Sequence, residues 1–219
     1  LRSVLNVAPG RPVRIGLIDG PYGVGIVTAV TSESVHLRCE FERDTPERPS
    51  VDLLLALPRP KVMKRLWAQL AAMGVGRVVL TNASKVERDY FDSHVLQEAG
   101  YRPLLLEGLQ QARDTRVPLV SIHKRHRVLL EDELDQLCPQ RRRALAHPGT
   151  GATVATALGT HTGRALLAIG PEGGWNEYEV GLLEAHGFQR AAMGTRVLAT
   201  TTACVALLAL AHETLRTEG

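Results

Sequence analysis

Glycine is concentrated in one short stretch of the chain, Ala168–Trp175, which reads AIGPEGGW. Three glycines fall within positions 170–174, a density that costs backbone entropy and suits a main chain that turns sharply or approaches a ligand closely. The apolar run 166–169 before them predicts a buried strand. Asn176 after them, followed by acidic residues, predicts the first turn of a helix. The stretch therefore predicts a strand-to-helix turn that presents main-chain groups to a ligand.

A second stretch of the same kind runs from Ala191 to Leu198, with the sequence AAMGTRVL, and leads into an apolar helix. Because the carboxyl ends of parallel strands meet at one edge of a sheet, two such stretches predict a single binding crevice. The alternative is that both are ordinary strand-to-helix turns. Neither a Walker loop nor the GxGxxG of a dinucleotide fold is present, so we do not expect a phosphate group in the crevice.

Residues 169–180 and 187–210 resemble the carboxyl-terminal motifs of the SPOUT superfamily of RNA methyltransferases. Within that superfamily they are most similar to the RsmE type, which methylates N3 of a uridine in small-subunit (16S) ribosomal RNA. The resemblance implies an α/β fold, with a trefoil-knotted, mostly parallel sheet that has helices on both faces. It also implies that S-adenosylmethionine is the cofactor and that the enzyme is a homodimer.

The glycine spacing and the resemblance together indicate which residues contact the cofactor. Backbone groups of the glycines would read the adenine edge, and apolar residues would form the other walls. Without the family context, Met193 and Leu198 would be interpreted as core residues. The expected cofactor-binding residues are His147, Pro148, Gly149, Ile169, Gly170, Pro171, Gly173, Gly174, Met193, Gly194, Val197, Leu198 and Thr202.

Methylation of uridine N3 requires loss of the imide proton and stabilisation of negative charge on the ring oxygens. A guanidinium suits the second task, and Arg196 matches the arginine of the family's Gly-x-Arg stretch. Glu172 is the only acid within the glycine-rich loop. It either binds the substrate or orders the knot, or it caps the following helix. Arg113 is the third catalytic candidate, because its segment resembles one that lies near the substrate in the family. The alternative for Arg113 is a solvated helix end.

Four basic residues are expected to contact RNA: Arg113, Arg116, Lys124 and Arg125. The basic runs 124–127 and 141–143 either follow an RNA backbone or belong to the solvated surface.

The chain departs from the family pattern at two positions. Ala199 and Thr201 stand where relatives usually carry an arginine and a glutamate. This departure keeps two further hypotheses open, a non-catalytic RNA-binding or ribosome-assembly factor on the same scaffold, and a SPOUT methyltransferase with another RNA target.

These residues need a scaffold, and the hydrophobic pattern predicts one in two parts. Residues 1–50 contain three short β segments and are expected to form a PUA-like β-barrel that contacts RNA, as the resemblance implies. A charged, proline-rich linker closes this part. Residues 51–219 alternate strands with helices, which predicts an α/β fold with a mostly parallel sheet. The resemblance implies that this part is the SPOUT methyltransferase domain with its carboxyl-terminal knot. Helical segments are expected over 61–73, over 92–113 with a break near Gly100 and Pro103, and over 130–138.

Composition sets the remaining expectations. The net charge of +3 is compatible with nucleic-acid binding. No apolar run approaches the roughly 20 residues of a membrane span, and the first residues lack the apolar core of a signal peptide, so we expect a cytoplasmic protein. Three scattered cysteines predict reduced thiols. His123 and His126 lack a third ligand, so no metal is expected.

Overall fold

The computed structural model describes residues 8–139, 142–149, 152–159 and 163–216. Its strands are β1 (Pro12–Gly16), β2 (Tyr22–Val30), β3 (Val35–Phe41), β4 (Val51–Ala56), β5 (Val75–Thr81), β6 (Leu119–His123), β7 (Arg142–Ala146), β8 (Ala165–Ile169) and β9 (Phe188–Ala191). Its longer helices are α2 (Pro60–Ala72), α3 (Glu98–Ala112), α7 (Glu177–Ala185) and α8 (Thr200–Arg216). Shorter helical segments are η1 (Arg88–Asp92), η2 (His94–Leu96), α4 (His126–Val128), the π-helical η3 (Leu129–Glu133), α5 (Leu134–Leu137) and α6 (Val154–Leu158).

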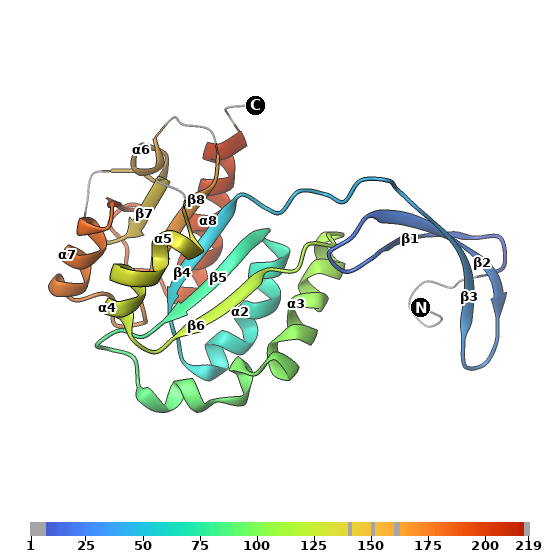
Figure 1. Ribbon diagram of the computed structural model, residues 1–219, viewed down its shortest axis with the longest axis horizontal. Helices are drawn as coiled ribbons and strands as arrows, with labels where there is room; N and C mark the ends of the chain where they lie inside the picture. The colour runs from blue at the N-terminus through green and yellow to red at the C-terminus, as the bar shows by residue number, and fades with distance from the viewer. Residues whose placement is uncertain (1–7, 140–141, 150–151, 160–162, 217–219) are drawn as a thin grey trace.

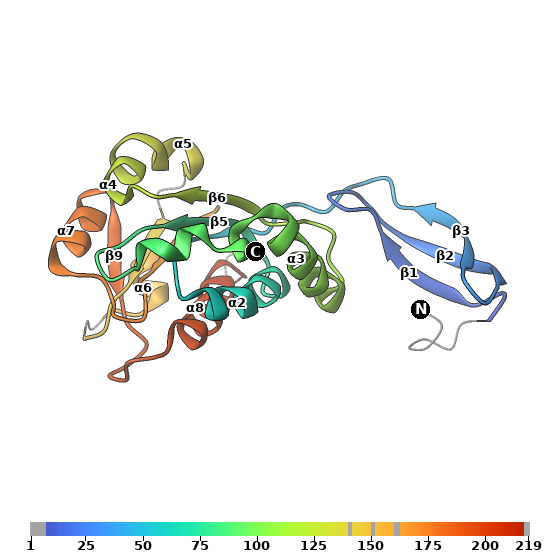
Figure 2. The same ribbon diagram turned by 90° about the horizontal axis from the view of Figure 1, so that it is seen from below.

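A six-stranded parallel sheet forms the centre of the molecule, in the order β6-β5-β4-β8-β7-β9. Every residue of β4 and β8 is buried, which explains why β8 is a continuous apolar run rather than an alternating one. Strand β4 is apolar except for Asp52, whose buried carboxylate accepts a hydrogen bond from Arg164. Helices α2, α3 and α8 cover one face of the sheet, and α4 and α5 lie over the other (Figures 1 and 2). The mostly parallel α/β class predicted from the sequence is therefore confirmed.

Local sequence signals account for the helix ends near the sheet. Gly74, with a φ of 72°, follows α2 in the left-handed conformation that terminates helices. At α7, Asn176 accepts a hydrogen bond from the Glu179 amide at 2.8 Å, and the Glu179 carboxylate accepts one from the Asn176 amide at 2.9 Å. This reciprocal capping box is the helix start that the sequence predicts. No described helix is both long and apolar enough to span a membrane.

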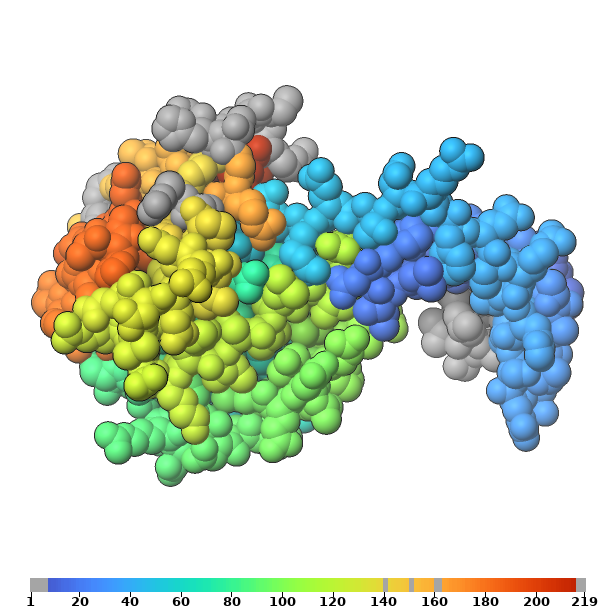
Figure 3. All heavy atoms as spheres, viewed as in Figure 1, coloured from blue at the N-terminus to red at the C-terminus, as the bar shows by residue number. Residues whose placement is uncertain are grey.

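The amino-terminal part is a separate antiparallel sheet in the order β1-β2-β3. It projects away from the α/β body and touches it near the end of α3 (Figures 1 and 3). Asp19, in the β1–β2 loop, donates its amide to Thr115 O at 2.8 Å and accepts the Val117 amide at 3.2 Å. Arg48 bonds both Asp19 and the carbonyl of Val117. These bonds join the small sheet to the segment that enters β6.

The described strands of this part form an open sheet, in which β1 and β3 each pair with β2 alone. The first seven residues of the expected PUA-like barrel lie outside the described residues. The barrel and the division of the chain at residue 50 stay predictions, although β4 does begin at Val51.

The predicted break at Gly100 and Pro103 is wrong, because both residues lie inside an uninterrupted α3. The helical stretch is interrupted earlier instead, once between η1 and η2 and again between η2 and the start of α3. Pro103 falls in the second turn of α3, close to the helix start, where few hydrogen bonds are lost. Gly100 is needed for packing instead, because a Cβ there would overlap the carbonyl oxygen of His94.

Helices α2 and α3 approach each other closely at Gly108, where a Cβ would overlap the backbone carbonyl of Ala68. We therefore predict that Gly108→Ala lowers the free energy of unfolding by about 1–3 kcal/mol, because the helices must separate. The matched control is Gly181→Ala in α7, where a Cβ meets no atom within 4 Å. Alanine favours a helix over glycine by about 1 kcal/mol, so this control should stabilise. Urea titrations measure both, and equal effects at the two sites would contradict the close packing.

Candidate functional site

A cavity of about 260 Å³ opens at the carboxyl ends of β7, β8 and β9. The register places Leu145 opposite Ala168 and Ala146 opposite Ala191, so these three strand ends lie side by side. The cavity is lined by Ala146, His147, Pro148, Ile169, Gly170, Pro171, Glu172, Gly173, Gly174, Trp175, Ala191, Ala192, Met193, Gly194, Arg196, Val197, Leu198, Thr200, Ala203 and Leu207. Both glycine-containing stretches therefore contribute to one crevice, and the alternative of two unrelated turns is wrong.

The glycine-rich stretch after β8 forms a tight turn. The Gly174 amide donates a hydrogen bond to Pro171 O at 2.8 Å, and Gly174 has a φ of 70°. Gly194, on the facing stretch, has a φ of 85°. Both values lie in the left-handed region that glycine adopts without strain. At Gly170 the requirement is space, because a Cβ would lie 3.1 Å from two ring atoms of Trp175.

Most of the expected cofactor-binding residues line this cavity. Two do not: Gly149 lies on the exposed turn after β7, and Thr202 is exposed on α8. The sequence interpretation missed Trp175 and the residues of α8 that face the cavity. The latter are Thr200, Ala203 and Leu207. Their spacing of three and four residues is that of one helix face, a signal available in the sequence.

Few titratable side chains reach the cavity; among its lining residues they are His147, Glu172 and Arg196. Arg196 is exposed at the rim. Glu172 accepts a hydrogen bond from the Arg59 amide at 3.3 Å, at the start of α2. The capping alternative for Glu172 is wrong, because Asn176 and Glu179 cap α7. His147 is partly buried, and its Nδ1 atom has no hydrogen-bond partner among the described atoms.

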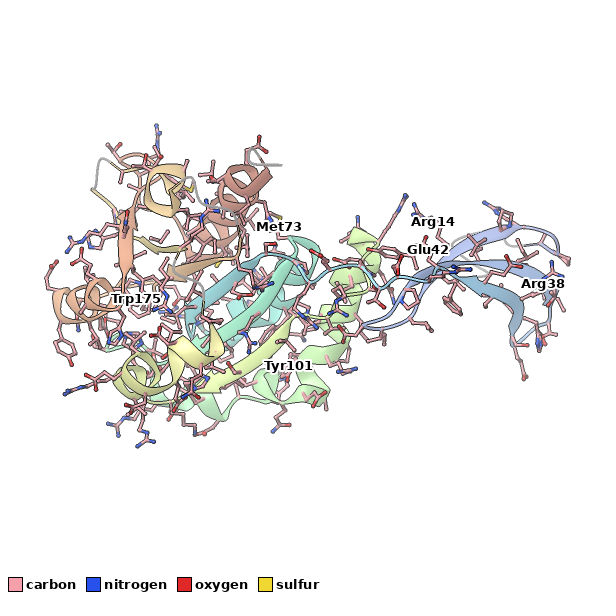
Figure 4. All side chains as sticks on the ribbon, turned by 45° about the horizontal axis from the view of Figure 1, so that its top comes forward. Arg14, Arg38, Glu42, Met73, Tyr101 and Trp175 are labelled. Carbon is pink, nitrogen blue, oxygen red and sulfur yellow. The ribbon has the colours of Figure 1, made fainter. Side chains whose placement is uncertain are left out.

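Behind the cavity, Trp175 packs against a partly buried histidine. The rings of Trp175 and His126 stack with centroids 5.2 Å apart, and Trp175 lies in the interior between α4 and α7 (Figure 4). His126 Nδ1 lies 3.2 Å from the Thr81 hydroxyl. Burial lowers the pKa of His126 to about 4, an effect that the nearby Glu179 carboxylate only partly opposes. His126 is therefore neutral at physiological pH, and the wall behind the cavity carries no positive charge there.

Arg113 and Arg116 lie at the other edge of the sheet. They follow α3 and precede β6, so within one chain they stand at the amino ends of the strands. Arg116 donates a hydrogen bond to Asp19 O at 3.0 Å and helps to join the amino-terminal sheet to the body. Arg113 is exposed and ends α3 with a φ of 58°. The structure therefore does not bring Arg113 together with Arg196 and Glu172 in a single copy.

The expected RNA contacts near β6 lie on the surface. Lys124 is exposed, 3.3 Å from an Asp92 carboxylate oxygen, and Arg125 is exposed beside it. In the run 141–143, Arg141 lies outside the described residues, whereas Arg142 and Arg143 are buried. Arg143 donates to Asp135 at 2.6 Å and to carbonyl oxygens of neighbouring segments. Arg142 and Arg143 therefore neither lie on the solvated surface nor are available to contact RNA, and both expectations are wrong for them.

The partial burial of His126, which lowers its pKa, predicts a specific loss of stability in acid. Its pKa is about 4 in the folded protein and near 6.5 when unfolded, so the unfolded chain binds more protons between these values. The free energy of unfolding should fall by up to about 3 kcal/mol as pH drops from 6.5 to 4, at about 1.4 kcal/mol per pKa unit. Urea titrations of the wild type and His126→Gln across this range isolate the effect. A difference between the two that does not change with pH would contradict it.

Comparisons with known proteins agree with this architecture. Residues 46–212 match the family model of the RNA methyltransferase domain. The ribosomal RNA small subunit methyltransferase E of Treponema pallidum is 29% identical over 227 residues, covering 97% of this chain and 82% of that protein. The ribosomal RNA small subunit methyltransferase E 1 of Borreliella burgdorferi is 24% identical over 156 residues, or 70% of this chain and 63% of that protein.

Among solved structures, the ribosomal RNA small subunit methyltransferase E of Neisseria gonorrhoeae, bound to S-adenosyl methionine, has the same fold. The TM-score is 0.76 at 19% identity, with 95% of this chain and 85% of that chain covered. The resemblance to the RsmE type that the motifs predict is confirmed, and the match across most of its length shows that this chain belongs to the RNA methyltransferase domain family.

Proposed function

We propose that the protein transfers the methyl group of S-adenosylmethionine to N3 of a uridine in small-subunit ribosomal RNA. The observation that carries the proposal is the meeting of Gly173 and Gly194 in one cavity, between two strand ends distant in the sequence. The ribosomal RNA methyltransferases to which the chain is similar support ribosomal RNA as the substrate.

The residues that line the cavity fit this cofactor. Backbone and apolar groups make up most of the wall, which suits a ligand that carries no phosphate and has a cationic sulfonium. His147 Nδ1 and Trp175 Nε1 are buried without a hydrogen-bond partner among the described atoms, so the wall retains polar groups that a ligand can satisfy after small adjustments. The Gly170–Gly174 turn, the Met193–Leu198 stretch and the start of α8 would hold it.

When bound, S-adenosylmethionine supplies an activated methyl group for attack by a nucleophilic nitrogen. Arg196 at the rim would donate hydrogen bonds to a uracil oxygen and stabilise the charge left when N3 loses its proton. Glu172 stands on the facing turn and would orient the base from the other side. A paired uridine uses N3 in its own base pair, so the base would be presented from a loop or flipped out.

One observation favours a second candidate function. Ala199 is exposed and Thr201 is partly exposed at the start of α8, next to cavity-lining residues, and neither supplies the charge usual in relatives. A binding factor for ribosomal RNA on the same scaffold would tolerate this loss. Another RNA target is the third possibility that the two substitutions allow.

The further parts of the proposal concern assembly and RNA contacts. We propose a homodimer, which the exposed apolar residues Val205 and Leu210 on α8 support. We also propose a knotted arrangement of the carboxyl-terminal strands. We also propose that the amino-terminal sheet, where Arg14 and Arg38 lie away from the cavity (Figure 4), contacts RNA, as do Lys124 and Arg125. Such an enzyme would work in the cytoplasm.

Two measurements on the wild-type protein test the function. Calorimetric titration with S-adenosylmethionine should show binding, and labelled methyl should pass to deproteinised small-subunit ribosomal RNA, in which mapping should find N3-methyluridine. Cofactor binding without transfer would favour the binding factor, and transfer to another base or RNA would favour a different target. No binding at millimolar cofactor would refute the proposal.

Arg196→Ala tests the chemical step. We predict that kcat falls by about 10²–10³-fold, as when one donor to a developing oxyanion is lost, while the dissociation constant of S-adenosylmethionine stays within about twofold. Single-turnover methyl transfer and calorimetry measure the two quantities. Arg102→Ala is the control, because Arg102 forms a surface ion pair with Glu98 within α3 and should leave both unchanged. Weaker cofactor binding with an unaltered rate would assign Arg196 to the cofactor instead.

A further inference from the structure

A lysine outside the cavity lies against the back of the glycine-rich turn. Lys85, in the loop between β5 and η1, donates a hydrogen bond from Nζ to Gly173 O at 2.6 Å. The aliphatic part of the same side chain covers the Gly173 backbone, and a Cβ on Gly173 would lie 2.6 Å from Lys85 Cδ. Lys85 itself does not line the cavity, so its effect on a ligand would pass through the turn.

This hydrogen bond restrains the peptide group between Gly173 and Gly174. Its carbonyl oxygen accepts from Lys85, and its amide, on Gly174, donates to Pro171 O at 2.8 Å. Two consecutive glycines allow many backbone conformations, so the orientation of this peptide depends on such external bonds. The turn therefore obtains part of its rigidity from the loop that carries Lys85.

Hydrogen bonds also fix the residue that precedes Lys85 in the chain, Ser84. The Ser84 amide donates to Glu179 Oε1 at 2.6 Å, and the Asn176 side chain donates to the Ser84 hydroxyl at 3.0 Å. Glu179 is only 5% exposed, and its other carboxylate oxygen closes the capping box of α7. The loop, the turn and the start of α7 thus form one hydrogen-bonded unit, in which Lys85 is the member that reaches Gly173.

We propose that Lys85 is a positioning residue that holds the glycine-rich turn in its cofactor-binding shape. The inference rests on the proposed function, because the affinity it affects is that for S-adenosylmethionine. Restraining the turn before binding removes an ordering cost that the ligand would otherwise bear. Among the described residues no carboxylate pairs with the Lys85 ammonium, and its hydrogen-bond acceptor is the Gly173 carbonyl oxygen.

The test compares Lys85→Met, which keeps an unbranched stem but no donor, with Lys85→Arg, which keeps donors and charge. Calorimetry with S-adenosylmethionine and S-adenosylhomocysteine should show binding about fivefold weaker in Lys85→Met and largely restored in Lys85→Arg. Hydrogen exchange of the cofactor-free protein, followed by mass spectrometry, should quicken at residues 170–176 in Lys85→Met. Arg88→Met is the matched control, because Arg88 is an exposed cation three residues further on, and this variant should change neither readout.

Unchanged cofactor affinity and unchanged exchange in Lys85→Met would overturn the inference while leaving the proposed function intact. A loss confined to RNA binding, with a weaker salt dependence, would also overturn it, since Lys85 would then be a phosphate contact. Failure of the wild type to bind S-adenosylmethionine would instead refute the proposed function, and this inference with it.

Discussion

The position of the site depends on the enclosure of β8 between β4 and β7. Strand β8 pairs with a parallel neighbour on each side, and all five of its residues are buried. A strand enclosed in this way can present chemistry only where it ends, at Gly170. Because neighbouring parallel strands end at the same edge, the turn after β8 lies beside the stretches that follow β7 and β9. This strand pairing creates the crevice. Glycines occur there because the backbone turns tightly where it borders the crevice.

The turn after β8 has little side-chain mass of its own, so its shape depends on contacts from other elements. Trp175 fills the space that a side chain on Gly170 would occupy and stacks on His126. Glu172 receives the Arg59 amide, while Lys85 bonds Gly173 from the side of β5. Three segments distant in the sequence therefore support one five-residue turn. Flexible backbone at a binding site is compatible with a defined geometry when the surrounding structure restrains it.

Some charged residues of this protein are buried and stabilise the fold, whereas others lie on the surface. Glu179 is buried and accepts two backbone amides, one from its own helix start and one from the Ser84 loop. Arg143 is buried between α5, β7 and the end of α7, where carbonyl oxygens and Asp135 receive its donors. Buried charges are retained where hydrogen bonds compensate their desolvation. A basic run in the sequence is therefore not by itself evidence of a nucleic-acid surface.

The sequence by itself determined the α/β class, the strand-to-helix turns and the two glycine-containing stretches of the cavity, because these depend on apolar runs, caps and glycines that act over a few residues. Asn176 marks the helix start within one turn, and the glycines near 170 and 194 mark where the backbone must bend. Only the tertiary structure decided which side chains stand behind those bends. His126, Lys85 and Trp175 meet there through strand order, and Arg116 is drawn to Asp19 at the opposite edge. Their environments are set by partners tens of residues away, and no local pattern encodes such contacts.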